Sequence, residues 1–177
     1  MTYLLYLLRD IIQLRRGPQD MPYSPRLLVA VCVAILVLQV IASYALDLPG
    51  DSMPVGVIGL VINLGFLYAA VTLRGFGSRF VQTATTLLCC AVIFSIVLLP
   101  IDIVFIKDPP VADQMSPLHL LLALIALPIF GWKLIVDAHI FRHSLGFPFL
   151  GGMAVAILWI TIAYGIAAAL SPNPPAS

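Results

Sequence analysis

Two pairs of polar residues, Lys133 with Asp137 and His139 with His143, stand near the end of a long apolar stretch. Residues four apart lie on one face of an α-helix, so the members of each pair can act together. An ammonium and a carboxylate inside a membrane serve either as a proton or ion relay or as a pair that neutralises itself. We favour the neutral pair, with the stem of Lys133 extended towards the membrane surface.

The two histidines have the spacing of metal ligands on one helix. No acidic residue lies between them, and Arg142 stands beside His143. Two imidazoles alone rarely complete a metal site, so we expect them to meet lipid headgroups, with no metal or other cofactor. An enzyme acting on a lipid or a quinone is an alternative, and it requires His139, His143 and Arg142 to converge on one pocket.

Two further polar residues, Asn63 and Asp102, stand within apolar stretches. An amide in hydrocarbon needs a partner, and for Asn63 we expect a hydrogen bond between helices, worth about 1 kcal/mol. A place on a transport path is the alternative. Asp102 follows Pro100, and we expect it to line an outer vestibule that water reaches. The candidate functional residues are therefore Asn63, Asp102, Lys133, Asp137, His139, Arg142 and His143.

The motifs of several common enzyme classes are missing from the sequence. It has no Walker loop, no GxSxG, no HExxH and no paired aspartates in an apolar stretch, so ATPase, serine hydrolase, zinc protease and aspartyl protease activities lack support. Cys32, Cys89 and Cys90 lie in apolar stretches without a CxxC pair, and we interpret them as small buried apolar residues. We predict no catalytic residue and no enzymatic activity.

The composition is that of an integral membrane protein. Of the 177 residues, 62% are hydrophobic and 10% are charged, whereas a soluble domain carries about a quarter charged residues. The net charge of +1 argues against nucleic acid as a partner.

The apolar residues form five long stretches separated by short polar breaks. At about 1.5 Å per residue, roughly twenty helical residues cross the hydrocarbon core of a bilayer. Pro100 with Asp102 is expected to end the membrane part of the third span near Leu99, and Ser116-Pro117 to cap the fourth. We predict an all-α transmembrane domain over residues 26–170 and a short disordered tail at 171–177. The predicted spans are 27–46, 54–73, 80–106, 117–140 and 147–170.

Residues 1–25 form an N-terminal segment and a linker. Residues 1–16 have a helical pattern but are too short and too charged to cross a membrane, and Gly17-Pro18 ends the helix. We expect an amphipathic helix that lies in the membrane interface with its apolar face towards the acyl chains. The alternative is that this face packs on the protein's own spans. The apolar face comprises Leu4, Leu5, Leu8, Ile11 and Ile12.

Positive charges in the short connections predict the orientation, because they favour the cytoplasmic side. Lys107 alone stands on the other side, and Lys133 lies within a few turns of the basic one. We expect the N-terminus to be cytoplasmic and the C-terminus outside. The basic side holds Arg9, Arg15, Arg16, Arg26, Arg74, Arg79 and Arg142.

Three stretches resemble the small Yip1-like membrane proteins of bacteria. The linker 14–25, LRRGPQDMPYSP, is similar to the linker that leads from their amphipathic segment into a five-span bundle. RFVQTATT (79–86) resembles the polar start of their third span, and WKLIVDAHIFR (132–142) the basic end of their fourth. The Asp-Leu-Tyr-Gly-Pro type of motif of eukaryotic members is absent, so the resemblance does not extend to their trafficking role. The resemblance implies a non-enzymatic bundle that binds other membrane proteins or shapes lipid.

We therefore expect a scaffold or accessory protein of a bacterial inner membrane, acting through helix packing and cytoplasmic-face contacts. Its partners would be membrane lipids and other membrane proteins or further copies of itself. The glycine-bearing face of the second span and the Gly152/Ala156 surface of the fifth are the candidate packing faces. The alternative is a small transporter or channel subunit with a polar path near Asn63, Lys133 and Asp137.

Overall fold

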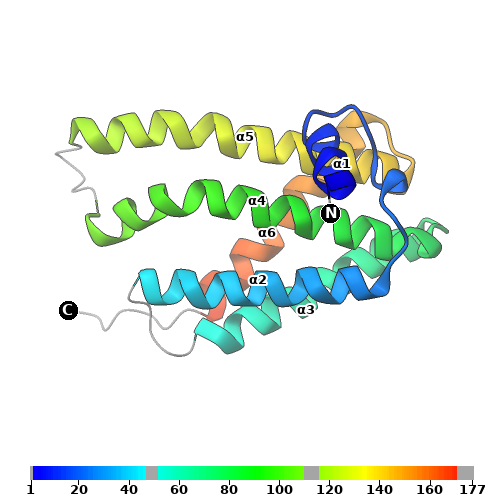
Figure 1. Cartoon of the computed structure of the whole chain (residues 1–177), viewed down its shortest axis with the longest axis horizontal. Helices are drawn as coiled ribbons and strands as arrows, with labels where there is room; N and C mark the ends of the chain where they lie inside the picture. The colour runs from blue at the N-terminus through cyan, green and yellow to red at the C-terminus, as the bar shows by residue number, and fades with distance from the viewer. Residues whose placement is uncertain (1, 47–51, 110–115, 171–177) are drawn as a thin grey trace.

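The computed structural model describes residues 2–46, 52–109 and 116–170, and every element in these ranges is helical. Figure 1 shows the long helices running along the molecule, with the N-terminal helix at one end and seen nearly end-on. The predicted tail at 171–177 lies outside the described residues. The elements are α1 (Thr2–Ile12), η1 (Pro18–Asp20), α2 (Pro25–Ala45), α3 (Ser52–Leu73), η2 (Gly77–Arg79), α4 (Phe80–Lys107), α5 (Pro117–Leu145) and α6 (Phe149–Leu170).

Four helical stretches of the described chain are long and apolar enough to cross a membrane. They are Pro25–Ala45, Pro54–Leu73, Gly77–Lys107 and Pro117–Leu145. The apolar stretch Phe149–Gly165 in α6 is shorter. An all-helical bundle with four helices of membrane-spanning length is thus established, and the fifth span stays a prediction.

Local sequence sets the ends of several helices. Ser24 and Ser116 are N-caps whose hydroxyls accept hydrogen bonds from the backbone N–H groups of Leu27 and His119, and a proline follows each cap in the first turn. Gly146 ends α5 with a left-handed φ of 65°, which glycine adopts without a steric penalty. The predicted cap at Ser116 is therefore confirmed.

The third predicted span is helical without interruption. Pro100 lies inside α4, which continues to Lys107, so the helix covers the predicted span 80–106, and the end of its membrane part near Leu99 stays a prediction. A proline removes one backbone hydrogen bond, but the turns on either side keep theirs, and membrane helices tolerate this loss.

The helix of the fourth predicted span is longer than the sequence suggested. α5 continues past Ile140 to Leu145. Arg142 and His143 therefore belong to its last turn and not to a loop. The chain offers no helix breaker in this stretch before Gly146, which is where the helix ends.

The densest packing lies at the end of the bundle where α1 sits, which we call the α1 end. Residues 83–90 of α4 and 136–141 of α5 are all buried there. The far halves of the helices pack more thinly, and Val31 is the only buried residue among the described side chains of α2. Side chains from α3 and α6 complete this core, among them Leu67, Val71 and Ala156.

The apolar face of α1 packs on the protein's own helices, which corrects the expectation that it faces acyl chains. Leu7 and Ile11 are 1% and 0% exposed, and Leu8 is buried with them in the common core. Burying these side chains against protein removes them from water as effectively as lipid does. Leu5, which the pattern placed on the apolar face, is 65% exposed instead.

A close contact joins α5 to α6. A Cβ atom on Gly152 would overlap the carbonyl oxygen of Ala138 and stand 3.0 Å from the backbone nitrogen of Arg142. Gly152 and Ala156 are both buried. The Gly152/Ala156 surface is therefore a packing face, as the sequence suggested, and the helix that packs on it is the chain's own α5.

Candidate functional site

A cavity of about 380 Å³ lies among the five long helices. It runs from Leu88 and Lys133, beside the packed core, to Gln39 and Asp102 in the far halves of α2 and α4. Its apolar walls come from every long helix, and four aromatic rings contribute to them. The apolar and aromatic lining includes Ile35, Leu60, Leu88, Phe94, Leu98, Phe130, Trp159, Ile160 and Tyr164.

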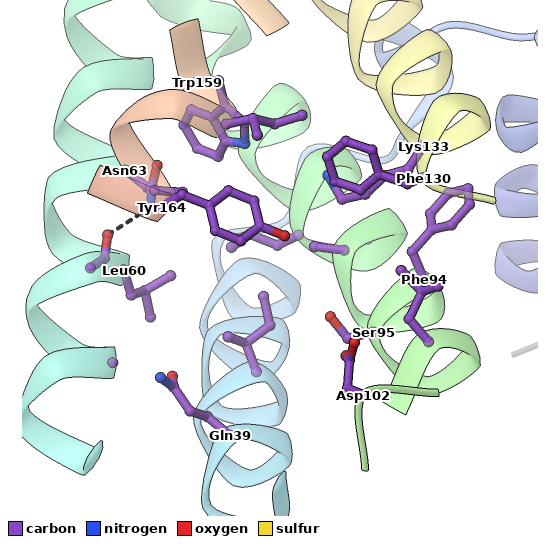
Figure 2. Close-up of a pocket in the computed structure, with 18 of the residues that line it drawn as sticks. Gln39, Leu60, Asn63, Phe94, Ser95, Asp102, Phe130, Lys133, Trp159 and Tyr164 are labelled. Atoms are coloured by element: carbon purple, nitrogen blue, oxygen red, sulfur yellow. Dashed lines mark hydrogen bonds between the residues drawn. The ribbon is translucent and has the colours of Figure 1, made fainter. Parts of the chain in front are cut away.

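Each of the five helices also contributes a polar side chain to the cavity. They are Gln39 of α2, Asn63 of α3, Ser95 and Asp102 of α4, Lys133 of α5 and Tyr164 of α6. Figure 2 shows the Tyr164 hydroxyl directed towards the middle of the cavity, between Asn63 on one side and the residues of α4 and α5 on the other. A polar side chain in hydrocarbon is expensive, so gathering six of them in one space favours a binding or transport role.

Asn63 does not make the expected bond to another helix. Its Nδ2 donates to the carbonyl oxygen of Gly59, one turn earlier in α3, at 2.9 Å. Its Oδ1 is buried and has no hydrogen-bond partner. The expectation of an interhelical hydrogen bond from this amide is therefore wrong.

Lys133 and Asp137 form the ion pair that their spacing indicates, with Nζ of Lys133 donating to Oδ2 of Asp137. The two side chains are 19% and 2% exposed. Lys133 lines the cavity, whereas Asp137 is buried and is not part of the lining. Of the three residues near which a polar path was predicted, Asn63 and Lys133 line the cavity and Asp137 does not.

Asp102 lies where the cavity approaches the far end of the bundle. It also lines a second cavity of about 290 Å³ between α2 and α4, which shares Gln39 and Ser95 with the first. Asp102 is exposed. Asp102 therefore lines both cavities, and its place in an outer vestibule stays a prediction.

His139, Arg142 and His143 do not line either cavity. The rings of His139 and His143 meet edge to face at 4.5 Å between centroids. Arg142 is exposed. Among the residues that the structure describes, no three His, Cys, Asp or Glu side chains gather closely enough to hold a metal ion.

His139 instead helps to dock the N-terminal segment. Its Nε2 lies 3.0 Å from the carbonyl oxygen of Arg16. A carbonyl can only accept, so Nε2 carries the proton and donates. Trp132 Nε1 donates to the carbonyl oxygen of Ile12 at 3.2 Å, and Gln82 Nε2 donates to that of Met21 at 2.6 Å.

Sequence reasoning missed several residues that the fold brings to these places. Gln39 is the only amide in the first predicted span, and this rarity was the signal available for it. The sequence does not show that Trp132 and Gln82 hold the N-terminal segment. Their hydrogen-bond acceptors are backbone carbonyl oxygens, which every residue has, so no residue type marks the contact. His119 was also missed: its Nε2 donates to the carbonyl oxygen of Asp108 at 2.6 Å and joins the end of α4 to the start of α5.

Comparisons of the chain with protein-family models, with curated proteins and with solved structures give no match. The Yip1-like resemblance therefore stays a prediction.

Proposed function

We propose that the chain is a five-span protein of a bacterial inner membrane, with the α1 end in the cytoplasm and the C-terminus outside. The charges support this orientation, because the arginines occupy segments at the α1 end, whereas Lys107 stands at the far end of α4. For the fifth span, α6 has 22 residues, which extend about 33 Å at 1.5 Å per residue. That length matches the hydrocarbon core.

Within this topology, the protein acts as a non-enzymatic scaffold or accessory protein of a Yip1-like type. The observation that carries the proposal is the docked α1, whose outer face leaves Tyr3, Leu5 and Tyr6 more than half exposed. Arg9 lies over the ring of Tyr6, at 5.5 Å from its centroid. Aromatic rings and arginines suit the boundary between headgroups and water, where membrane proteins meet lipids and one another.

The docking of α1 also makes this outer face suitable for recognition. Side chains of α4 and α5 hold the backbone of residues 12–21, so little conformational entropy remains to be lost on binding. Gly65 and Ala69 of α3 are exposed as well and remain available for close helix packing. Gly56 and Gly59 are not available, because the first lies against Gln39 and the second lines the cavity.

Site-specific photo-crosslinking in native membranes tests the scaffold role. A photoreactive phenylalanine at Tyr6 should give discrete protein adducts, either with another membrane protein or with a second copy of this chain. The same residue at Leu7, which is buried beside it, is the matched control and should give none beyond the chain itself. A strictly monomeric purified protein, with lipid as the only adduct at Tyr6, would contradict the proposal.

A second candidate function is that of a small transporter or channel subunit. The cavity favours it, since Asn63, Asp102 and Lys133 all line one space of about 380 Å³. The packed core closes this space towards the α1 end, so transport would require the helices to move there. Asp137 would then serve as a proton relay together with Lys133.

Liposomes with a pH-sensitive dye inside test this second role. The wild type should carry protons faster than empty liposomes, and Asp137→Asn should abolish the difference while the protein still elutes as a folded species. A wild-type rate equal to that of empty liposomes would contradict proton transport.

A further inference from the structure

We propose that the cavity binds a small neutral amphiphile: a compact aromatic or apolar body that carries a hydroxyl or amine group, whose hydrogen is donated to Asn63 Oδ1. The ligand would bind here whether or not the protein transports it. Binding is also independent of the scaffold role.

Asn63 provides the acceptor. Its Oδ1 is buried and has no hydrogen-bond partner. A buried oxygen without a donor destabilises the protein, and a ligand that donates a hydrogen bond to it removes this cost. The orientation of this amide is fixed by chemistry. The neighbouring carbonyl of Gly59 can only accept, so the nitrogen must face it and the oxygen must face away. Any donor that reaches this atom therefore meets an oxygen and not a second N–H.

The charges of the lining favour a neutral ligand over an anion. Lys133 is the only cationic side chain in the lining, and its ammonium is already paired with Asp137. Asp102 is exposed at the other end of the cavity and repels anions that approach there. A buried charge on a ligand would need an opposite charge beside it, and the wall near Asn63 offers none.

The walls indicate the shape of the ligand. About 380 Å³ is within the range of small-molecule pockets. Aromatic rings of Phe94, Phe130 and Tyr164 line the space together with Trp159, and such rings pack well against an aromatic guest. Trp159 also packs on Phe66, with 6.0 Å between ring centroids, so its position does not depend on the ligand.

Trp159 allows binding to be measured directly. The chain has two tryptophans, and the other, Trp132, is at the α1 end against Ile12. In a Trp132→Phe background, fluorescence therefore reports on the cavity alone.

The probes are 4-bromophenol and 4-bromoanisole, which share the ring and the quenching bromine, but only the phenol has a hydroxyl to donate. They are added below neutral pH, where the phenol is uncharged. The wild type, with both tryptophans, is titrated in parallel to show that Trp132→Phe leaves binding unchanged.

The phenol should quench Trp159 saturably, and its apparent affinity should exceed that of the anisole about tenfold, the ratio expected of one hydrogen bond to a buried acceptor. Asn63→Leu should lower phenol affinity to that of the anisole and leave anisole binding unchanged. Equal, unsaturable quenching by both probes would show partitioning into the detergent and would overturn the proposal. So would an Asn63→Leu variant that still prefers the phenol.

Two glycines of α3 give a matched pair of variants. A Cβ atom on Gly59 or on Gly65 would meet no atom within 4 Å, so neither position has a clash at Cβ. Only Gly59 lines the cavity. Gly59→Leu should therefore block phenol binding, whereas Gly65→Leu should not. Loss of binding in both variants, or in neither, would contradict the assignment.

A lipid acyl chain is the competing occupant. In bilayers of phosphatidylcholine with brominated acyl chains, Trp159 should be quenched weakly, and 4-methylphenol, which carries no halogen, should not relieve that quenching. Strong quenching by the brominated chains in the absence of phenol would identify an acyl chain as the occupant and overturn the proposal. Gly59→Leu should leave crosslinking at Tyr6 unchanged, so failure of this site and failure of the scaffold role are separate results.

Discussion

At the scale of single residues, the buried ion pair in α5 does most to define the site. Asp137 is almost completely buried and its charge is balanced by Lys133, which also supplies part of the cavity wall. A carboxylate in an apolar core is tolerated when a partner compensates for its lost hydration. The pair therefore lets the chain place a polar wall inside the bundle without leaving a net charge there.

Variants of this pair should show strong coupling. Lys133→Met leaves the carboxylate of Asp137 buried and alone, and should lower the free energy of unfolding by about 3 kcal/mol. Asp137→Leu should cost less, because Lys133 is the more exposed partner. The double variant should recover much of the loss, as measured by SDS titration in mixed micelles. Losses that simply add would contradict a coupled pair.

Gly152 and Gly165 lie on the same helix and should respond to alanine in opposite directions. Gly152→Ala forces a Cβ atom onto the carbonyl oxygen of Ala138, and should lower stability by about 1–3 kcal/mol. A Cβ atom on Gly165 would meet no atom within 4 Å, so Gly165→Ala should be neutral or stabilise the helix by up to about 1 kcal/mol. The two variants are compared by the midpoints of their thermal unfolding in mild detergent. Equal effects would mean that α6 does not approach α5 at Gly152.

At the scale of elements, the N-terminal segment is held by side chains that donate to its backbone. Gln82 of α4 and Trp132 and His139 of α5 reach carbonyl oxygens between Ile12 and Met21. Ile12 ends α1, where backbone acceptors have no partner within the helix, and Arg16 and Met21 lie in the linker beyond it. The docking therefore satisfies acceptors that would otherwise be left without one, and it fixes α1 against the bundle.

Removing a donor should loosen this segment and leave the spans intact. Gln82→Ala removes the bond to Met21, and one hydrogen bond of about 1 kcal/mol corresponds to about a fivefold rise in the population of the undocked segment. Trypsin should then cut faster after Arg15 or Arg16. Gln39→Ala, at the far half of α2, is the control and should leave the cleavage rate unchanged. An unchanged rate in Gln82→Ala would show that this bond does not hold the segment.

At the scale of the whole molecule, the bundle has a packed end and a thinly packed end. Core residues cluster at the α1 end, and the cavities open among the far halves of the helices. The arginines occupy the same end as the core. If the positive charges face the cytoplasm, the closed end is inside and both cavities approach the outer side.

Labelling with a membrane-impermeant maleimide tests this orientation. In a variant without Cys32, Cys89 and Cys90, a new cysteine at Ser78, in the connection between α3 and α4, should react only after the cells are permeabilised. A cysteine at Ser116, at the start of α5, should react in intact cells. The reverse pattern would place the arginines outside and contradict the proposed topology.

The sequence by itself determined where the membrane-length helices lie and how the fourth predicted span begins. Apolar length is a property of consecutive residues, and the cap at Ser116 acts within a single turn, so both can be predicted without knowing the fold. The ion pair between Lys133 and Asp137 could also be predicted, because a spacing of four residues on one helix brings the two side chains together.

Only the tertiary structure decided what the apolar and polar faces meet. Leu7 and Ile11 are as apolar as a lipid-facing residue, and the sequence could not tell protein from acyl chain as their partner. Gln39, Asn63 and Tyr164 come from three helices, and no local pattern shows that they share one cavity. Such contacts depend on how distant helices pack, and packing is decided by close fit, as at Gly152, rather than by hydrophobicity.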